Sequence, residues 1–123
     1  MIKHMTESEK QVMDLLWKSE VPLSCDEIVR LSTDKTWKDS YVHSLMKSLT
    51  KKGIAQIVSF ELTTRSYARK FAPKISYDEY VLLSSFSEDE IKDTDRMARF
   101  IRIVADHSES DKLLESIYGT LSR

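Results

Sequence analysis

The chain has few of the residues that break regular structure, with only two glycines and two prolines among 123 residues. Long irregular segments are therefore not expected, and the chain should be mostly helical. Its one cysteine, Cys25, excludes an internal disulfide and a metal site built from several thiolates. No apolar run approaches the roughly 20 residues that cross a bilayer. These absences predict a soluble, cytoplasmic protein without a membrane segment.

Patterns typical of catalysis and metal binding are also absent. The three histidines, His4, His43 and His107, are scattered, so no zinc site is expected. There is no nucleophile–base pair and no glycine-rich phosphate loop. The sequence thus predicts no catalytic residue, no metal, no cofactor and no enzymatic activity. Cys25 leaves two interpretations open, a sensor thiol of lowered pKa or a small residue at a helix start.

The net charge of −1 hides a difference between the two parts of the chain. Residues 1–73 carry 12 Lys and Arg against 9 Asp and Glu, a net of +3, and residues 74–123 carry 7 against 11, a net of −4. The stretch 38–74 has eight cations against Asp39 and Glu61, a net of +6. Such a basic patch indicates an anionic partner such as DNA, although a solvated charged face is the alternative.

Helix starts are marked by four Ser/Thr-x-x-Glu capping boxes, in which side chains satisfy free backbone N–H groups. The boxes are Thr6/Glu9, Ser24/Glu27, Ser76/Glu79 and Ser87/Glu90. Apolar spacing predicts helices over 7–19, 25–32 and 39–52, the last ending at Gly53. The buried face of the third helix is expected to consist of Val42, Leu45, Met46 and Leu49. Trp17 and Trp37 are expected in the core.

The pattern changes from helical to β-prone after Gly53. Two short strands within 54–60 and 67–71, joined through residues 61–64, predict a β-hairpin. Three helices followed by a hairpin is the order of a winged helix-turn-helix, which we place at residues 1–73. Residues 74–123 return to helical spacing, with helices expected from Ser76, near 88–107 and near 110–122. The predicted fold class is mainly α with a small β-hairpin wing, followed by C-terminal dimerisation helices.

The C-terminal helices carry apolar stripes that need a surface to pack against. Self-association is favoured over packing on residues 1–73, because symmetric dimers are common and a dimer supplies a second half-site. The residues expected in the homodimer interface are Tyr80, Ile101, Val104, Leu113, Leu114, Ile117, Tyr118 and Leu121.

The outward face of the helix over 39–52 is polar and cationic, without an acid between Ser40 and Lys52. It suits the major groove of double-stranded DNA, where hydroxyls meet base edges and lysines meet phosphates. Hairpin arginines are expected to reach flanking phosphates or a minor groove. The predicted DNA-binding residues are Lys38, Ser40, Tyr41, Ser44, Lys47, Ser48, Lys51, Lys52, Arg65 and Arg69.

Several stretches match a known family pattern. They are Thr6-Glu-Ser-Glu-Lys-Gln-Val-Met-Asp-Leu-Leu-Trp17, Trp37-x(7)-Leu45-x(3)-Leu49-x-Lys51-Lys52-Gly53, Tyr67-x(3)-Phe71-Ala-Pro73 and Ile75-Ser-Tyr-Asp-Glu-Tyr80. Together they resemble the BlaI/MecI/CopY family of penicillinase-type repressors. The resemblance implies a dimeric winged-helix repressor on a palindromic operator. In β-lactam-responsive members it also implies release when a membrane sensor's signal leads to proteolytic cleavage in the C-terminal region.

The chain departs from the family pattern at positions expected to face DNA. Lys38-Asp39-Ser40-Tyr41 stands in place of Ser-Pro-Lys-Thr, and Ser44 and Ser48 replace a frequent Thr and a frequent Arg. The wing tip is longer and lacks the usual Glu-Gly-Arg. The operator is therefore expected to differ from the standard one. The cysteine pairs of copper-responsive members are missing, so copper sensing is not expected.

Two other functions stay open from the sequence. One is a protein-interaction module that uses the acidic C-terminal half as its contact surface. The other is a repressor with a small-ligand pocket between the dimer helices, lined by Tyr77, Tyr80, Phe100 and Tyr118. A plain hydrophobic dimer core explains the same aromatic residues.

Overall fold

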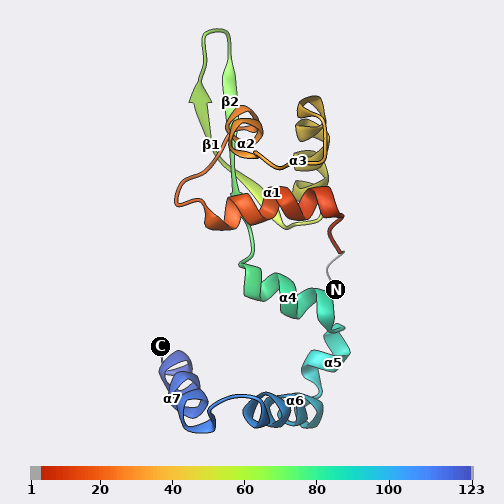
Figure 1. The fold of residues 1–123 in the computed structure, drawn as a ribbon, viewed down its shortest axis with the longest axis vertical. Helices are drawn as coiled ribbons and strands as arrows, with labels where there is room; N and C mark the ends of the chain where they lie inside the picture. Colours follow the sequence, from red (N-terminus) through yellow and green to blue (C-terminus); the bar gives the residue numbers. More distant parts are fainter. Residues whose placement is uncertain (1–3, 123) are drawn as a thin grey trace. The chain divides into compact units, whose positions relative to one another are not determined.

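The computed structural model describes residues 4–122 as a series of helices with one β-hairpin (Figure 1). In chain order the elements are α1 (Glu7–Lys18), α2 (Cys25–Leu31), the 3-10 turn η1 (Asp39–Tyr41), α3 (Val42–Lys51), β1 (Ala55–Leu62), β2 (Tyr67–Pro73), α4 (Tyr77–Ser85), α5 (Glu88–Lys92), α6 (Thr94–Asp106) and α7 (Ser110–Leu121). The predicted class, mainly α with a hairpin wing, is confirmed. The chain forms two compact units, Met1–Ser85 and Phe86–Arg123, which we describe separately.

Three of the four predicted capping boxes are complete. The hydroxyls of Thr6, Ser24 and Ser87 each accept the backbone N–H of the glutamate three residues on, whose carboxylate accepts the cap's own N–H. At the fourth box, the Glu79 N–H donates to the Ser76 hydroxyl at 3.0 Å. Because helices leave their first N–H groups without partners, these caps fix where the helices begin.

The core of the first unit lies between α1, α2, α3 and the start of the hairpin. Its buried apolar residues are Val12, Met13, Leu16, Leu23, Ile28, Trp37, Val42, Leu45, Met46, Leu49, Ile54, Ala55 and Phe71. Trp37 is buried as predicted, and Trp17 is half-buried against this cluster. All four apolar residues predicted for the third helix belong to the core. Residues 1–73 therefore contain a core of their own.

The third helix is shorter than predicted at its start. The expected range of 39–52 is divided into η1 and α3, and no side chain caps η1 at Lys38. The predicted end is confirmed, because Gly53 follows with a φ of 76°. This left-handed conformation closes many helices and favours glycine, which has no Cβ to clash.

The hairpin is antiparallel and contains one extra residue, Val58, in a β-bulge on β1. In Figure 1 it projects beyond α2 and α3. At its base, Leu23 exchanges two backbone hydrogen bonds with Phe71, at 2.9 and 2.8 Å. The connection between α1 and α2 is thus tied to β2, which fixes the lower part of the hairpin against the helices.

α4 belongs to the first unit and packs on α1. The indole N–H of Trp17 donates to the carbonyl of Ile75 at 3.0 Å, and the ring of Tyr77 meets that of Trp17 edge-on with centroids 5.2 Å apart. The hydroxyl of Tyr80 accepts the backbone N–H of Met5 at 2.9 Å. The two compact units consequently divide after α4, whereas the functional boundary expected from the sequence follows residue 73.

The second unit corrects one prediction. The single helix expected near 88–107 is wrong, because Asp93 separates α5 from α6. Its carboxylate accepts the N–H of Arg96 at 3.1 Å, which is an N-cap that starts a new helix. The rings of Phe86 and Phe100 are in contact, with centroids 4.9 Å apart. Even so, no residue of 86–122 is buried, so the described part of this unit has no closed core.

Candidate nucleic-acid interface

The third helix turns one side to the core and the other to solvent. Its four core residues are at most 3% exposed. Of the residues predicted to contact DNA, six before or on this helix are exposed, namely Lys38, Ser40, Tyr41, Ser44, Lys47 and Lys51. His43 and Thr50, which are not among the predicted DNA contacts, are exposed as well. We call Ser40, Tyr41, His43, Ser44, Lys47, Thr50 and Lys51 the outer face of α3.

A cleft of about 940 Å³ lies between the start of α2, the outer face of α3 and the hairpin. Three cations line it, Lys47 and Lys51 from α3 and Arg69 from β2. Apolar side chains, among them Phe71, complete the lining, and Asp26 contributes an acid. Three of these four charged residues are cations, and a concave surface with an excess of one charge concentrates the field that attracts a polyanion. The sequence did not predict this cleft, because it forms between elements distant in the chain.

The hairpin offers both cationic and apolar side chains. Arg65 in the turn and Arg69 on β2 are exposed, as expected for DNA contacts. Three large apolar residues, Phe60, Leu62 and Tyr67, are 62–72% exposed on the strands. None of the three is among the residues predicted from the sequence to bind DNA. Their β-prone character predicted the strands but not which side chains lack a cover.

Two predicted DNA-binding residues, Ser48 and Lys52, contact α1 through Glu9, which is 2% exposed. The Ser48 hydroxyl donates to one Glu9 oxygen at 2.8 Å, and the Lys52 ammonium donates to the other at 2.6 Å. Burial acts to raise the pKa of Glu9, but Lys52, the backbone N–H of Thr6 and the Ser48 hydroxyl outweigh it and hold the pKa below 4.5. Glu9 is therefore a buried carboxylate that anchors the end of α3 on α1.

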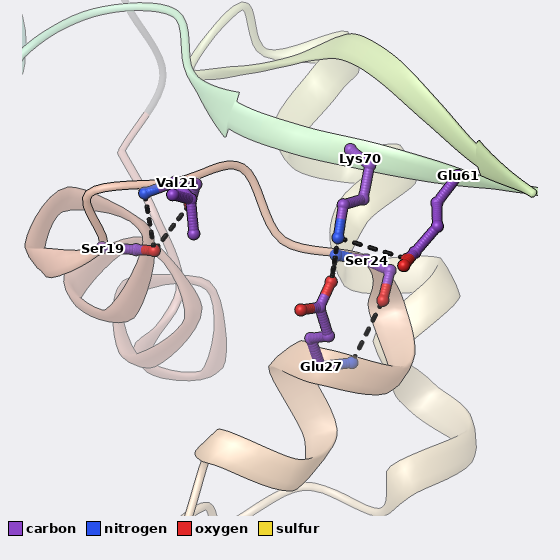
Figure 2. Close-up of polar contacts among 6 residues, drawn as sticks. All are labelled: Ser19, Val21, Ser24, Glu27, Glu61 and Lys70. Atoms are coloured by element: carbon purple, nitrogen blue, oxygen red, sulfur yellow. Dashed lines mark hydrogen bonds and ion pairs between the residues drawn. The ribbon is translucent and has the colours of Figure 1, made fainter.

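Lys70, another cation of the basic stretch, extends from β2 toward the start of α2 (Figure 2). Its ammonium donates to Glu27 at the start of α2 and, at 3.2 Å, to Glu61 on β1. Hydrogen bonds from Lys70, which has the largest effect, and from the backbone N–H of Ser24 lower the pKa of Glu27 from 4.5 to about 2. The bond to Glu27 raises the pKa of Lys70, and Glu61 adds to the effect. Lys52 and Lys70 are thus both paired with acids of the first unit, Lys52 with the buried Glu9 and Lys70 with the partly exposed Glu27 and Glu61.

Cys25 lies beside the cleft at the start of α2 and is half-buried. Burial raises the pKa of its thiol above 9.0, and the nearby Asp26 raises it further. The thiol is therefore protonated at neutral pH, which favours a small residue at a helix start over a reactive sensor. Over residues 4–122, no three His, Cys, Asp or Glu side chains gather as a metal site.

The residues predicted for a homodimer interface occupy two environments. Tyr80 is half-buried on α4, where its ring lies 6.0 Å from that of Trp17. Leu113 and Ile117 on α7 are half-buried. The others, which are 52–78% exposed on α6 and α7, are Ile101, Val104, Leu114, Tyr118 and Leu121. We call these five residues the apolar surface of the second unit, and it lacks a cover within the described part of that unit.

The aromatic residues suggested for a ligand pocket have separate partners. Tyr77 and Tyr80 pack on Trp17 in the first unit. Phe100 packs on Phe86 in the second unit, where Tyr118 is 71% exposed. These contacts account for three of the four side chains without a ligand.

Three helices, the third with an exposed polar face beside a two-stranded hairpin, define a winged helix-turn-helix protein. The sequence profile of the penicillinase repressors matches residues 5–119, which includes the C-terminal helices. The chain therefore belongs to the penicillinase repressor family, a family of transcriptional repressors. No curated protein matches the sequence. From residue 4 to 122, none of the helices has the length and apolarity needed to cross a membrane.

Proposed function

We propose that this repressor binds a palindromic double-stranded DNA operator as a cytoplasmic homodimer, with α3 of each protomer in a major groove. The proposal rests on the outer face of α3, which has no acid from Ser40 to Lys51 and continues into the cation-lined cleft. Hydroxyl groups on this face suit base edges, and its lysines suit phosphates. The proposed contacts are Lys38, Ser40, Tyr41, Ser44, Lys47, Lys51, Arg65 and Arg69. Ser48 and Lys52 support α3 from behind.

Reading of DNA belongs to residues 1–73 and dimerisation to residues 74–123, with α4 packed on the reading unit. The apolar surface of the second unit supports this division, because exposed apolar residues on two adjacent helices favour association. A two-fold dimer would present two α3 helices to half-sites separated by about one helical turn, roughly 34 Å.

Selection of bound duplexes from a random pool, followed by titration at several salt concentrations, tests the proposal. A dimer brings six cleft cations to the DNA, so these alone should give a slope of log affinity against log salt near −5, at about 0.9 per phosphate contact. Replacing Lys47 and Lys51 by Ala should reduce the slope by roughly 3–4 and weaken binding to every sequence. Lys10→Ala, which removes an exposed lysine from α1, is the matched control.

The stoichiometry follows from sedimentation of the complex. Two chains on one duplex, with half-sites about one turn apart, would support the dimeric operator complex. Recovery of no duplex from the pool, or binding that does not change with salt, would contradict the proposal. One chain per selected duplex would contradict its dimeric part.

Relief of repression by proteolysis, with a sensor or protease as partner, rests on the family resemblance. A cut between α6 and α7 would remove part of the apolar surface and so uncouple the two half-sites. A protease site introduced at residues 107–109 tests this. After cleavage the chain should bind the operator only as tightly as a single half-site, and unchanged affinity would refute it.

A further inference from the structure

We propose that Lys70 is a positioning residue which, through Glu27 and Glu61, holds the hairpin in the orientation needed for DNA. The acid Glu27 would then support the binding of a polyanion. This inference rests on the proposed function for its DNA readout. The positioning itself is measurable without DNA.

The contacts of Lys70 join three elements. Lys70 extends from β2, Glu27 from α2 and Glu61 from β1 (Figure 2). The Lys70 side chain is 17% exposed, so it is directed into the fold although it belongs to the most basic stretch. One oxygen of Glu27 accepts both this ammonium and, at 3.0 Å, the N–H of Ser24. The carboxylate that caps α2 therefore also fastens β2.

The exposed part of the hairpin needs a contact with the helices, such as the Lys70–Glu27 ion pair, to keep its orientation. An isolated two-stranded hairpin is at best marginally stable. The backbone pairing of Leu23 with Phe71 holds its base, and Lys70 is one residue nearer the tip. Arg69 precedes Lys70 on β2 and lines the cleft. Because neighbouring residues of a strand point to opposite faces, fastening Lys70 on one face fixes where Arg69 lies on the other.

Glu27→Gln is the most informative variant, because glutamine also serves in a capping box but carries no charge. Removal of a negative charge near DNA should by itself strengthen binding. If the Lys70–Glu27 contact positions the hairpin, Glu27→Gln should instead weaken operator binding roughly three- to tenfold, as expected for loss of a partly exposed charge pair. Asp26→Asn, which removes the neighbouring acid at the cleft, is the matched control and should leave binding unchanged or tighter.

Amide hydrogen exchange of the free full-length chain provides the DNA-independent readout. Lys70→Gln and Glu27→Gln should both raise exchange in β1 and β2 and leave α1 and α3 unchanged. Combining the two changes should add little, because both remove the same contact. Lys70→Arg should restore wild-type exchange and binding. If Lys70→Gln does not fold, Glu27→Gln, which breaks the same contact from its other side, remains the test.

Two results would overturn the proposal. One is tighter DNA binding by Glu27→Gln together with a salt slope shallower by about 1 per protomer in Lys70→Gln, which would make Lys70 a phosphate contact. The other is unchanged hairpin exchange in both variants. If the wild-type chain binds no DNA at all, the proposed function fails, and the exchange measurements decide the positioning role on their own.

Discussion

Lys51 and Lys52 are neighbours at the end of α3, but their side chains lie in different surroundings. Lys51 is exposed and lines the cleft. The Lys52 ammonium lies 2.6 Å from the Glu9 carboxylate and donates to the His4 carbonyl at 3.1 Å. Lys52→Met should therefore destabilise the fold. Lys51→Met should weaken DNA binding and leave the stability unchanged.

The size of the first effect follows from the burial of the pair. Removing one partner of a buried ion pair costs roughly 3–5 kcal/mol. The cost is lower here, because Lys52 is itself 17% exposed and Glu9 keeps hydrogen bonds from Ser48 and Thr6. We expect a loss of about 2–3 kcal/mol in the free energy of unfolding.

Urea unfolding measures this loss directly. With a slope of about 1–3 kcal/mol per molar urea, Lys52→Met should lower the midpoint by about 0.7–3 M. Lys51→Met should stay within about 0.3 M of the wild type, as surface substitutions usually do. In a double-mutant cycle with Glu9→Gln, the two losses should not add, because both variants break one pair.

Three results would refute this reasoning. An unchanged urea midpoint in Lys52→Met would show that the pair adds nothing to stability. Additive losses in Lys52→Met and Glu9→Gln would show that the two residues act separately. A salt slope of DNA binding that Lys52→Met reduces as much as Lys51→Met would show that both lysines contact phosphate.

Acid should weaken the fold through Glu27, whose pKa is about 2 instead of 4.5. A lowered folded-state pKa gives stability that is complete above about pH 5 and lost as the pH falls toward about 2, and Lys70→Gln should flatten this part of the pH profile. Gly53→Ala should lower the free energy of unfolding by about 1 kcal/mol, because alanine is strained at the positive φ of this position. No atom lies within 4 Å of the added Cβ, so a steric clash adds nothing. An unchanged urea midpoint would contradict this. Tyr118→Ser with Leu121→Ser should turn dimers into monomers in sedimentation, and Thr120→Ser is the control; a persisting dimer would place the interface elsewhere.

Local signals were sufficient for most helices of the first unit. The ends of α1 and α2 lie within one residue of the predicted ones, because a capping box, apolar spacing and a stop signal agree there. The break at Asp93 was missed for the opposite reason. Helical spacing continues from Ile91 to Ala98 across the N-cap, so periodicity concealed the start of a new helix.

The site was predictable only as far as it is local. Helical spacing correctly indicated that Ser44, Lys47 and Lys51 are exposed. It did not indicate that Ser48 and Lys52 contact Glu9, because a helical pattern does not reveal which side chains meet a partner from another element. Lys52 and Glu9 are 43 residues apart in the chain. A count of charges along the sequence carries no information about such pairs.

The Lys52–Glu9 and Lys70–Glu27 ion pairs are built in the same way. Glu9 and Glu27 are the last residues of the first two capping boxes. Each accepts a hydrogen bond from a lysine on an element proposed to contact DNA. The glutamate that caps α1 holds the end of α3, and the one that caps α2 holds β2. The partly positive helix N-terminus also stabilises a carboxylate at this position, so each acid has two reasons to stay ionised. A variant without both acids would carry more positive charge, yet it would hold α3 and the hairpin less firmly. In this unit, affinity for DNA should therefore depend on where the cations are held as well as on how many there are.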